Sequence, residues 1–313
     1  MGFTTFDYVV IVVYLISVAG LGIHAAGRQS STSDYFMGGE GLPWWAATFS
    51  VVATETSTLT FISIPAVAYG GNLTFLQITF GYIVGRILVS KLLLPAYFRG
   101  KMSTAYQFLE QRFGAAMRNA ASTTFMVTRL LADGVRLFAT AIPLAIILRL
   151  GGAFTGWGDV ELYLLSIAAI SVITLIYTLI GGIKAVVWMD VMQMAVYVGG
   201  AVLAIGIMIA DLPNGLSSAM TIASDAGKLQ IVDFGFGQPF ADFIAQPYTF
   251  FTALIGGAIF SIASHGTDQL IVQRLLTTRD VRRTASEPSS GAASWWPEVW
   301  AISVYRSAAL RFL

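Results

Sequence analysis

Long apolar runs recur along this chain, and they constrain its fold more than any other feature. A helix needs about 20 mostly apolar residues to cross the hydrocarbon core of a bilayer, and only 11% of this chain is charged, against about 25% in soluble domains. We therefore expect an all-α integral membrane protein. The predicted spans are residues 6–26, 43–70, 73–97, 121–149, 160–181, 184–210 and 249–272.

Positive charges in the connections between these spans predict the orientation of the chain. Cytoplasmic loops of membrane proteins carry an excess of Lys and Arg, and here ten such residues follow the first, third, fifth and seventh spans while two follow the others. We expect a multi-pass protein of the plasma or inner membrane with its N-terminus outside. The ten are Arg28, Arg99, Lys101, Arg112, Arg118, Lys184, Arg274, Arg279, Arg282 and Arg283, and the two are Arg149 and Lys228.

One short polar stretch belongs to the inner face in this topology. The letters "YQFLEQRFG" at 106–114 mix apolar and charged residues, which is typical of an amphipathic helix lying on the bilayer surface. The lipid bilayer is thus an expected partner of the chain.

Composition excludes several functional classes. A net charge of +1 gives no reason to expect a nucleic-acid partner. The chain has no cysteine, and its two histidines, His24 and His265, are far apart in sequence, so neither a thiolate nucleophile nor a Cys/His metal cluster is expected. No Gly-rich phosphate loop and no nucleophile with an adjacent base is recognisable, so we expect neither an enzyme nor an organic cofactor. Protein partners are not predicted.

A run of hydroxyls and one carboxylate interrupts the second predicted span. Residues 54–60 read "TETSTLT", between "PWWAATFSVVA" and "FISIPAVAYGG". Hard cations prefer carbonyl, hydroxyl and carboxylate oxygens, and transporters present such groups where a helix unwinds near the membrane midplane. We expect an unwound ion and substrate site around Glu55. The alternative is that Glu55 pairs with a distant arginine purely for packing.

Further ionisable residues fall inside the spans, where each is costly unless paired or hydrated. In "RLLADGVR", Arg129 and Asp133 are four residues apart, and Asp133 and Arg136 are three apart, so all three share one helical stripe. Mutual ion pairing and contact with a substrate are both open for this set. Arg86 is expected to reach back to the interface by extending its side chain.

Three motifs resemble the sodium:solute symporter family, whose members include sodium/glucose, sodium/proline, sialic acid and pantothenate transporters. The resemblance runs from about residue 5 to residue 283. It implies the inverted-repeat helix bundle also seen in the leucine-type amino-acid transporters, with an extra N-terminal helix at 6–26, a first repeat at 43–210 and the start of a second repeat at 249–272. The motifs are "SDYFMGGEGLPWWAATFSVVATETST", "LIGGIKAVVWMDVMQM" and "GTDQLIVQRLLTTRD".

The resemblance implies sodium ligands. In the family, the main sodium site takes backbone carbonyls from the broken first repeat helix, and Ala53 and Thr56 stand at those places. Asp190 in "VVWMD" matches the buried Asp assigned to a further sodium site in the sialic acid branch, although a packing role for this carboxylate is the alternative. An acid at the position of Glu55 matters in the proline transporter. Na⁺ is the implied coupling ion, with H⁺ left open.

The resemblance also implies substrate contacts, and here the chain departs from the sugar pattern. The galactose branch has Gln, Glu and Tyr where this chain has Thr60, Thr79 and Ser264, so sugar hydroxyls would lose an acceptor and a stacking ring, and a hexose is not expected. Arg binds carboxylates bidentately, so the in-span arginines favour a carboxylate-bearing small solute. The full set of implied substrate or ion positions is Glu55, Thr60, Thr79, Tyr82, Arg129, Arg136, Ser261 and Ser264.

After Arg283 the sequence changes to a Ser/Pro/Ala-rich text, "TASEPSSGAASWWPEVW". We expect a symporter domain over residues 1–283 and an atypical tail over 284–313 that is truncated or frame-shifted. The serine-bearing helix of the second repeat, which completes the main sodium site in the family, would then be missing. The predicted function is a sodium-coupled secondary active symporter working by alternating access. The alternatives are a non-transporting fragment and a membrane sensor of the same family.

Overall fold

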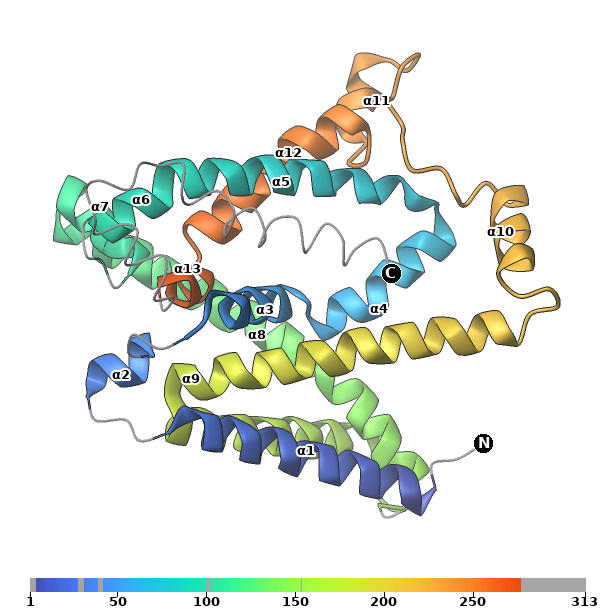
Figure 1. Ribbon diagram of the computed structural model, residues 1–313, viewed down its shortest axis with the longest axis horizontal. Helices are drawn as coiled ribbons and strands as arrows, with labels where there is room; N and C mark the ends of the chain where they lie inside the picture. Colours follow the sequence, from blue (N-terminus) through green and yellow to red (C-terminus); the bar gives the residue numbers. More distant parts are fainter. Residues whose placement is uncertain are drawn as a thin grey trace. The chain divides into compact units, whose positions relative to one another are not determined.

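The computed structural model describes residues 4–27, 31–38, 42–99, 102, 104–152 and 154–276, and these are helical and connecting segments without strands. The predicted all-α class is therefore confirmed for the described residues (Figure 1). The elements are α1 (Thr5–Ala26), α2 (Thr32–Met37), α3 (Trp44–Glu55), α4 (Thr58–Gly70), η2 (Leu73–Gln77), α5 (Ile78–Leu88), η3 (Val89–Leu93), α6 (Leu94–Arg99), α7 (Ala105–Phe113), α8 (Ala115–Leu150), α9 (Asp159–Ala210), α10 (Leu216–Asp225), α11 (Phe240–Ala245), α12 (Phe250–Gly266) and α13 (Gln269–Leu276).

Five helices in the described part are long and apolar enough to cross a membrane, and the bent pair α3 and α4 gives a sixth. Each of the seven predicted stretches maps onto one of these helices, but residues 160–181 and 184–210 both fall within α9. The number of spans thus stays a prediction. The five are Thr5–Ala25, Leu73–Tyr97, Ala115–Leu150, Asp159–Ala210 and Phe240–Gly266.

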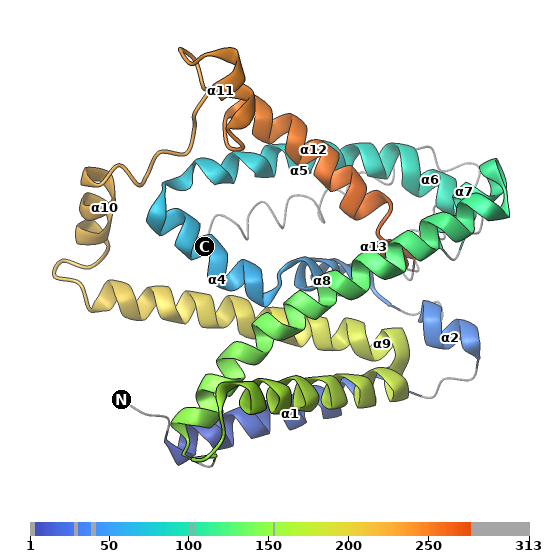
Figure 2. The same ribbon diagram turned by 180° about the vertical axis from the view of Figure 1, so that it is seen from behind.

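The long helix α9 is interrupted at a glycine pair. Gly182 has φ 54° and ψ −154°, a conformation essentially closed to residues with a Cβ. At this point the chain reverses, so that the start of the second half runs back along the first (Figure 2). This is the Gly-Gly break of the motif "LIGGIKAVVWMD", and it separates the two spans predicted within α9.

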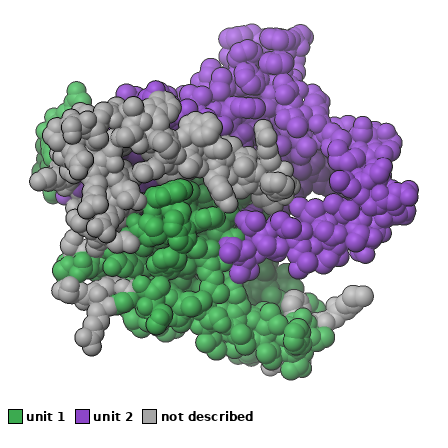
Figure 3. Space-filling view, in the orientation of Figure 1, with its two compact units in different colours: residues 1–61, 109–194, 277–279 green, residues 62–108, 195–276, 280–313 purple. Residues whose placement is uncertain are grey.

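The chain divides into two compact units, drawn in green and purple in Figure 3. Unit 1 comprises residues 1–61, 109–194 and 277–279, and unit 2 comprises residues 62–108, 195–276 and 280–313. The boundaries fall inside α4, α7 and α9. Unit 1 therefore contains the whole of α3 and α8, the first turn of α4, and α9 as far as Met194.

The second half of α9 packs against α3 in unit 1. A buried cluster joins Leu42 and Ala46 to Ile183 and Val187. Beside it, the rings of Trp45 and Trp188 meet edge to face, with 5.4 Å between their centroids. The apolar residues that precede the polar stretch are thus buried against α9. This packing holds α3 next to Asp190.

Small residues bring α5 and α12 into close contact in unit 2. A Cβ added to Gly81 would lie 2.5 Å from the carbonyl oxygen of Leu254, and one added to Gly85 would lie 2.6 Å from Cβ of Ser261. Helices in membranes associate through such small residues because their backbones can approach closely.

The environment of Arg86 differs from the prediction. Its side chain does not extend to an interface, because the residue is only 6% exposed and its guanidinium carbon lies 6.0 Å from the ring centroid of Tyr82. Arg86 lies eleven residues, about three helical turns, before the end of the predicted span at residue 97. The neighbouring glycines instead let α12 cover this face of α5, and the expectation of snorkelling is wrong.

The last described helices also revise a boundary. α12 ends at Gly266 and α13 begins at Gln269, so the predicted span 249–272 crosses a break at residues 267–268. Tyr97 donates a hydrogen bond of 2.6 Å to the carbonyl of Gly266, which is one of the carbonyls that the helix end leaves without an intrahelical partner. The predicted tail 284–313 lies outside the described residues.

Candidate functional site

The predicted unwinding of the polar stretch is confirmed. α3 ends at Glu55, α4 begins at Thr58, and the two helices are bent by 65°. The amide of Thr56 donates to the carbonyl of Val52 at 3.0 Å and closes the last turn of α3. The carbonyl of Ala53 comes after this last bond, so it belongs to the set that a helix end leaves for other partners. Carbonyl oxygens at a helix C-terminus carry partial negative charge, which suits a cation.

The other side of the break has the opposite character. Ser57 caps α4: its carbonyl accepts from the amide of Phe61 at 3.1 Å and its hydroxyl accepts from the amide of Thr60 at 3.3 Å. The N-terminal end of a helix carries partial positive charge. The break thus places a cation-attracting end and an anion-attracting end a few residues apart.

Asp190 meets α3 directly. The hydroxyl of Ser50 donates to Oδ2 of Asp190, across 140 positions of sequence. Ser50 is fully buried, and its own carbonyl accepts from the hydroxyl of Thr54 at 2.7 Å. Ser50 is therefore hydrogen-bonded both to the Asp190 carboxylate and to Thr54, which follows Ala53 in the chain.

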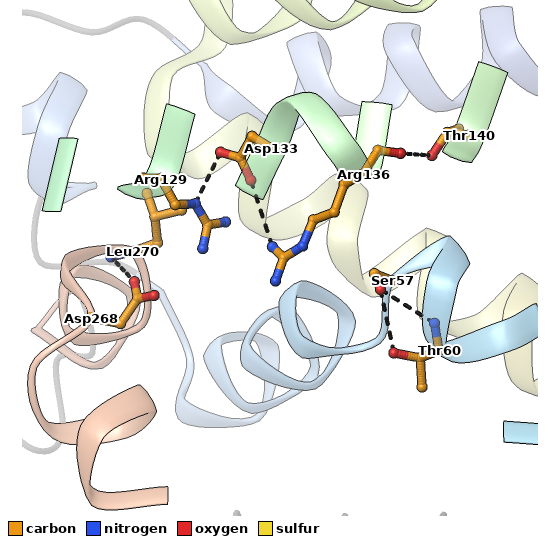
Figure 4. Close-up of polar contacts among 8 residues, drawn as sticks. All are labelled: Ser57, Thr60, Arg129, Asp133, Arg136, Thr140, Asp268 and Leu270. Atoms are coloured by element: carbon orange, nitrogen blue, oxygen red, sulfur yellow. Dashed lines mark hydrogen bonds and ion pairs between the residues drawn. The ribbon is translucent and has the colours of Figure 1, made fainter. Parts of the chain in front are cut away.

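The charged stripe on α8 forms the predicted ion pairs. Nε of Arg129 lies 2.9 Å from Oδ2 of Asp133, and Nη1 of Arg136 lies 3.6 Å from Oδ1 of the same carboxylate (Figure 4). Mutual pairing within this set is thus confirmed. The longer distance leaves Arg136 the more weakly held of the two arginines.

One turn further along α8, Thr140 contacts the start of α4. The hydroxyls of Thr140 and Thr58 are 2.9 Å apart, and Thr140 also donates to the carbonyl of Arg136 at 2.9 Å. The backbone of Arg136 therefore lies one helical turn before Thr140, the residue of α8 that contacts Thr58 at the break. Figure 4 shows its side chain extending from α8 toward the ribbon of α3 and α4.

The remaining predicted positions belong to unit 2. The hydroxyl of Thr79 donates to the carbonyl of Leu76 at 2.7 Å. Ser261 is fully buried, and its hydroxyl donates to the carbonyl of Tyr82 at 3.3 Å, so it takes part in the contact between α5 and α12. Ser264 lies beside His265, with 2.9 Å between Oγ and Nδ1. Unit 1 holds Ala53, Glu55, Thr56, Thr60, Arg129, Arg136 and Asp190.

Three polar residues at the site were not predicted. Ser50 and Thr140 give no sequence signal of their own, because each is an isolated hydroxyl in an apolar helix, where bonding to the preceding turn is the ordinary outcome. Thr58 was noted only as part of the polar run. A search for hydroxyls one helical turn from in-span charges would have found Thr140, four residues after Arg136, whereas Ser50 is five residues before Glu55 and gives no such signal.

Comparison with known proteins places these features in a family. The family described as the sodium:solute symporter family matches residues 35–291. The human sodium/iodide cotransporter is 31% identical over 282 residues, which is 88% of this chain and 41% of that protein. The sodium/sialic acid symporter SiaT of Proteus mirabilis (strain HI4320) is 32% identical over 278 residues, which is 89% of this chain and 53% of that protein.

A solved structure is similar throughout the chain. It is described as the substrate-bound outward-open state of a Na⁺-coupled sialic acid symporter with a novel Na⁺ site, and it matches with a TM-score of 0.75 and 29% identity. The match covers 98% of this chain and 60% of that structure. The predicted membrane helix bundle of the inverted-repeat type is thereby confirmed. The chain spans about half the length of the curated relatives that it matches.

Proposed function

Because the chain belongs to the sodium:solute symporter family, we propose that it serves sodium-coupled uptake of a small organic anion by alternating access. The observation that carries this proposal is the 65° break between α3 and α4, with a polar residue at nearly every position. Irregular backbone is tolerated at membrane depth only where it lines a cavity or is buried in protein. A multi-pass bundle built around such a break is suited to transport.

Sodium is proposed to bind at the α3 side of the break. The carbonyls of Ala53 and Thr56 supply neutral oxygens, and Glu55 supplies a carboxylate. Asp190 is proposed as a ligand of a further sodium ion, with Ser50 holding its carboxylate toward α3. Sodium bound at these oxygens would order the break, and substrate binding to the ordered form would couple the two ligands, because both then prefer the same state.

The substrate is proposed to carry a carboxylate. Arg136 and the N-terminal end of α4 both attract anions. The Asp133 carboxylate lies closer to Arg129 than to Arg136, so Arg136 is the more available of the two arginines for a substrate. Thr60 would add a hydroxyl donor on the first turn of α4. Three of the similar proteins are named for anions, namely iodide, sialic acid and monocarboxylates. Thr79, Tyr82, Ser261 and Ser264 are retained as proposed contacts from α5 and α12.

The test is uptake of labelled carboxylates by proteoliposomes that contain the full chain. We expect uptake with an inward Na⁺ gradient and little uptake when K⁺ replaces Na⁺ on both sides. Arg136→Gln should lower uptake at limiting substrate about 10- to 100-fold, because a hydrogen bond to a charged group is worth about 1.5–3 kcal/mol.

Arg149→Gln is the matched control. Arg149 lies at the other end of α8, where it pairs with Asp159 at 2.6 Å, so this variant should transport normally. An uptake rate that is the same with and without the Na⁺ gradient would contradict the proposed coupling. Full activity of Arg136→Gln on every acidic solute would contradict the substrate class while leaving the coupling intact.

A further inference from the structure

The joint between α7 and α8 forms an exposed elbow. α7 ends at Phe113 and α8 begins at Ala115, with Gly114 between them at φ 83°. This positive φ is readily adopted only by glycine, so the turn is built into the sequence. Figure 2 shows α7 and α8 meeting at this turn.

An ion pair braces the elbow. Nη1 of Arg118, on the first turn of α8, lies 2.8 Å from Oε1 of Glu110 on α7. Nε and Nη2 of the same guanidinium donate to Oδ1 of Asn119 at 3.2 and 3.1 Å. Arg118 and Glu110 therefore neutralise each other and hold the angle between the helices, which leaves the neighbouring Arg112 to set the charge of the surface.

The outer side of the elbow combines one cation with two large apolar side chains. Arg112 is exposed and has no hydrogen-bond or ion-pair partner among the described residues. Phe113 is 60% exposed and Met117 is 46% exposed. We call Arg112, Phe113 and Met117 the elbow surface.

The backbone at the elbow adds to its positive character. No side chain caps the N-terminus of α8, and the first turn of α8 holds no acidic residue. The first amides of a helix point outward with partial positive charge and attract anions. Arg112 stands three residues before Ala115, which supplies the first of these amides.

The elbow also stands where α8 enters the apolar region. Farther along α8, Met126 is 70% exposed and Leu130 is 75% exposed, and this helix is long enough to span a bilayer. Cationic and aromatic side chains at the end of a span favour the headgroup layer.

We propose that the elbow surface binds the headgroup of an anionic phospholipid in the cytoplasmic leaflet. Arg112 and the first amides of α8 contact the phosphate, and Phe113 and Met117 lie among the upper parts of the acyl chains. A basic residue near a membrane surface attracts anionic lipid by about 1 kcal/mol, or about fivefold in relative affinity. The proposal requires membrane insertion but not symport.

The test uses the absence of native cysteine in this chain. Gln111→Cys, beside the elbow surface, carries a fluorescent label in the full chain reconstituted into nanodiscs. Brominated phosphatidylglycerol or brominated phosphatidylcholine is mixed with the unlabelled lipids, and quenching gives the relative affinity for the two lipids. We expect about a fivefold preference for the anionic lipid, which weakens at high salt.

Arg112→Gln in this background should bring the preference close to one, whereas Arg149→Gln should leave it unchanged. Equal quenching by both lipids in the parent, or a preserved preference in Arg112→Gln, would overturn the proposal. Absence of quenching by either lipid would also overturn it, since it would show that protein covers the elbow surface. None of these outcomes depends on transport activity.

Discussion

Ser50 is the residue of α3 that contacts the Asp190 carboxylate directly. Its hydroxyl is completely buried and donates to the carboxylate. Asp190 is partly buried, so loss of this hydrogen bond leaves part of the cost of removing its carboxylate from water without compensation. The Ser50 hydroxyl therefore contributes to the stability of the folded protein through its hydrogen bond to Asp190.

Ser50→Ala should lower the free energy of unfolding by about 1.5–3 kcal/mol, measured by thermal unfolding of the purified protein in detergent. Thr48→Val is the control on the same helix, because the Thr48 hydroxyl only donates to the carbonyl of Trp44 at 2.9 Å. That change should cost less than about 1 kcal/mol. Equal losses in the two variants would show that the contact with Asp190 contributes nothing beyond packing.

Tyr106 offers a prediction about pH. Burial, together with the charges of Asp268 and Tyr97, raises the pKa of Tyr106 from 10.0 to about 12. Between these values the unfolded chain has lost the phenolic proton while the folded chain keeps it. The contribution of Tyr106 to stability is thus fully present below pH 10 and is lost as the pH rises toward 12.

Absorbance titration at alkaline pH should reveal this group as the difference between the wild type and Tyr106→Phe. We expect the difference curve to have its midpoint near 12. Asp268→Asn should move the midpoint part of the way down, because burial remains the larger cause. A midpoint near 10 in the wild type would contradict the burial of this phenol.

At the scale of elements, the two interruptions of helices follow from local chemistry that the sequence displays. The run 54–60 was predicted to unwind because it gathers the oxygen groups that transporters present to cations at a broken helix, and α3 does end there. The predicted spans 160–181 and 184–210 are separated at Gly182, which has a conformation that only glycine adopts readily.

Gly182→Ala should destabilise the protein by about 1–3 kcal/mol, the usual cost of forcing a side chain into a disallowed region. Thermal unfolding measures the loss. Gly199→Ala is the control within the same helix, because nothing lies within 4 Å of an added Cβ there. That variant should be neutral or slightly stabilising. A neutral Gly182→Ala would mean that the reversal of α9 does not require glycine.

At the scale of the whole molecule, the orientation in the membrane is still a prediction from loop charges. It places the connection 211–248 outside and the elbow between α7 and α8 inside. In intact cells, a membrane-impermeant thiol reagent should label Ser224→Cys directly. Gln111→Cys should be labelled only after permeabilisation. Both positions are exposed, so the opposite pattern would reverse the predicted topology rather than reflect burial.

The sequence by itself determined the membrane class, the apolar stretches that form the long helices, the broken second span and the family. These properties depend on local composition and on motifs, and a run of apolar residues or a Gly-Gly pair behaves similarly in any bundle. Charged pairs spaced three or four residues apart, such as those of Asp133, are likewise local, and their pairing was one of the two alternatives that the sequence left open.

Only the tertiary structure decided which distant polar groups meet. Ser50 finds Asp190 across 140 residues and Thr58 finds Thr140 across 82. Arg86 is buried because glycines on α5 admit α12, although its side chain was expected to reach the interface. Such contacts depend on how the helices approach one another, and that geometry arises from packing over the entire bundle rather than from the residues adjacent in sequence.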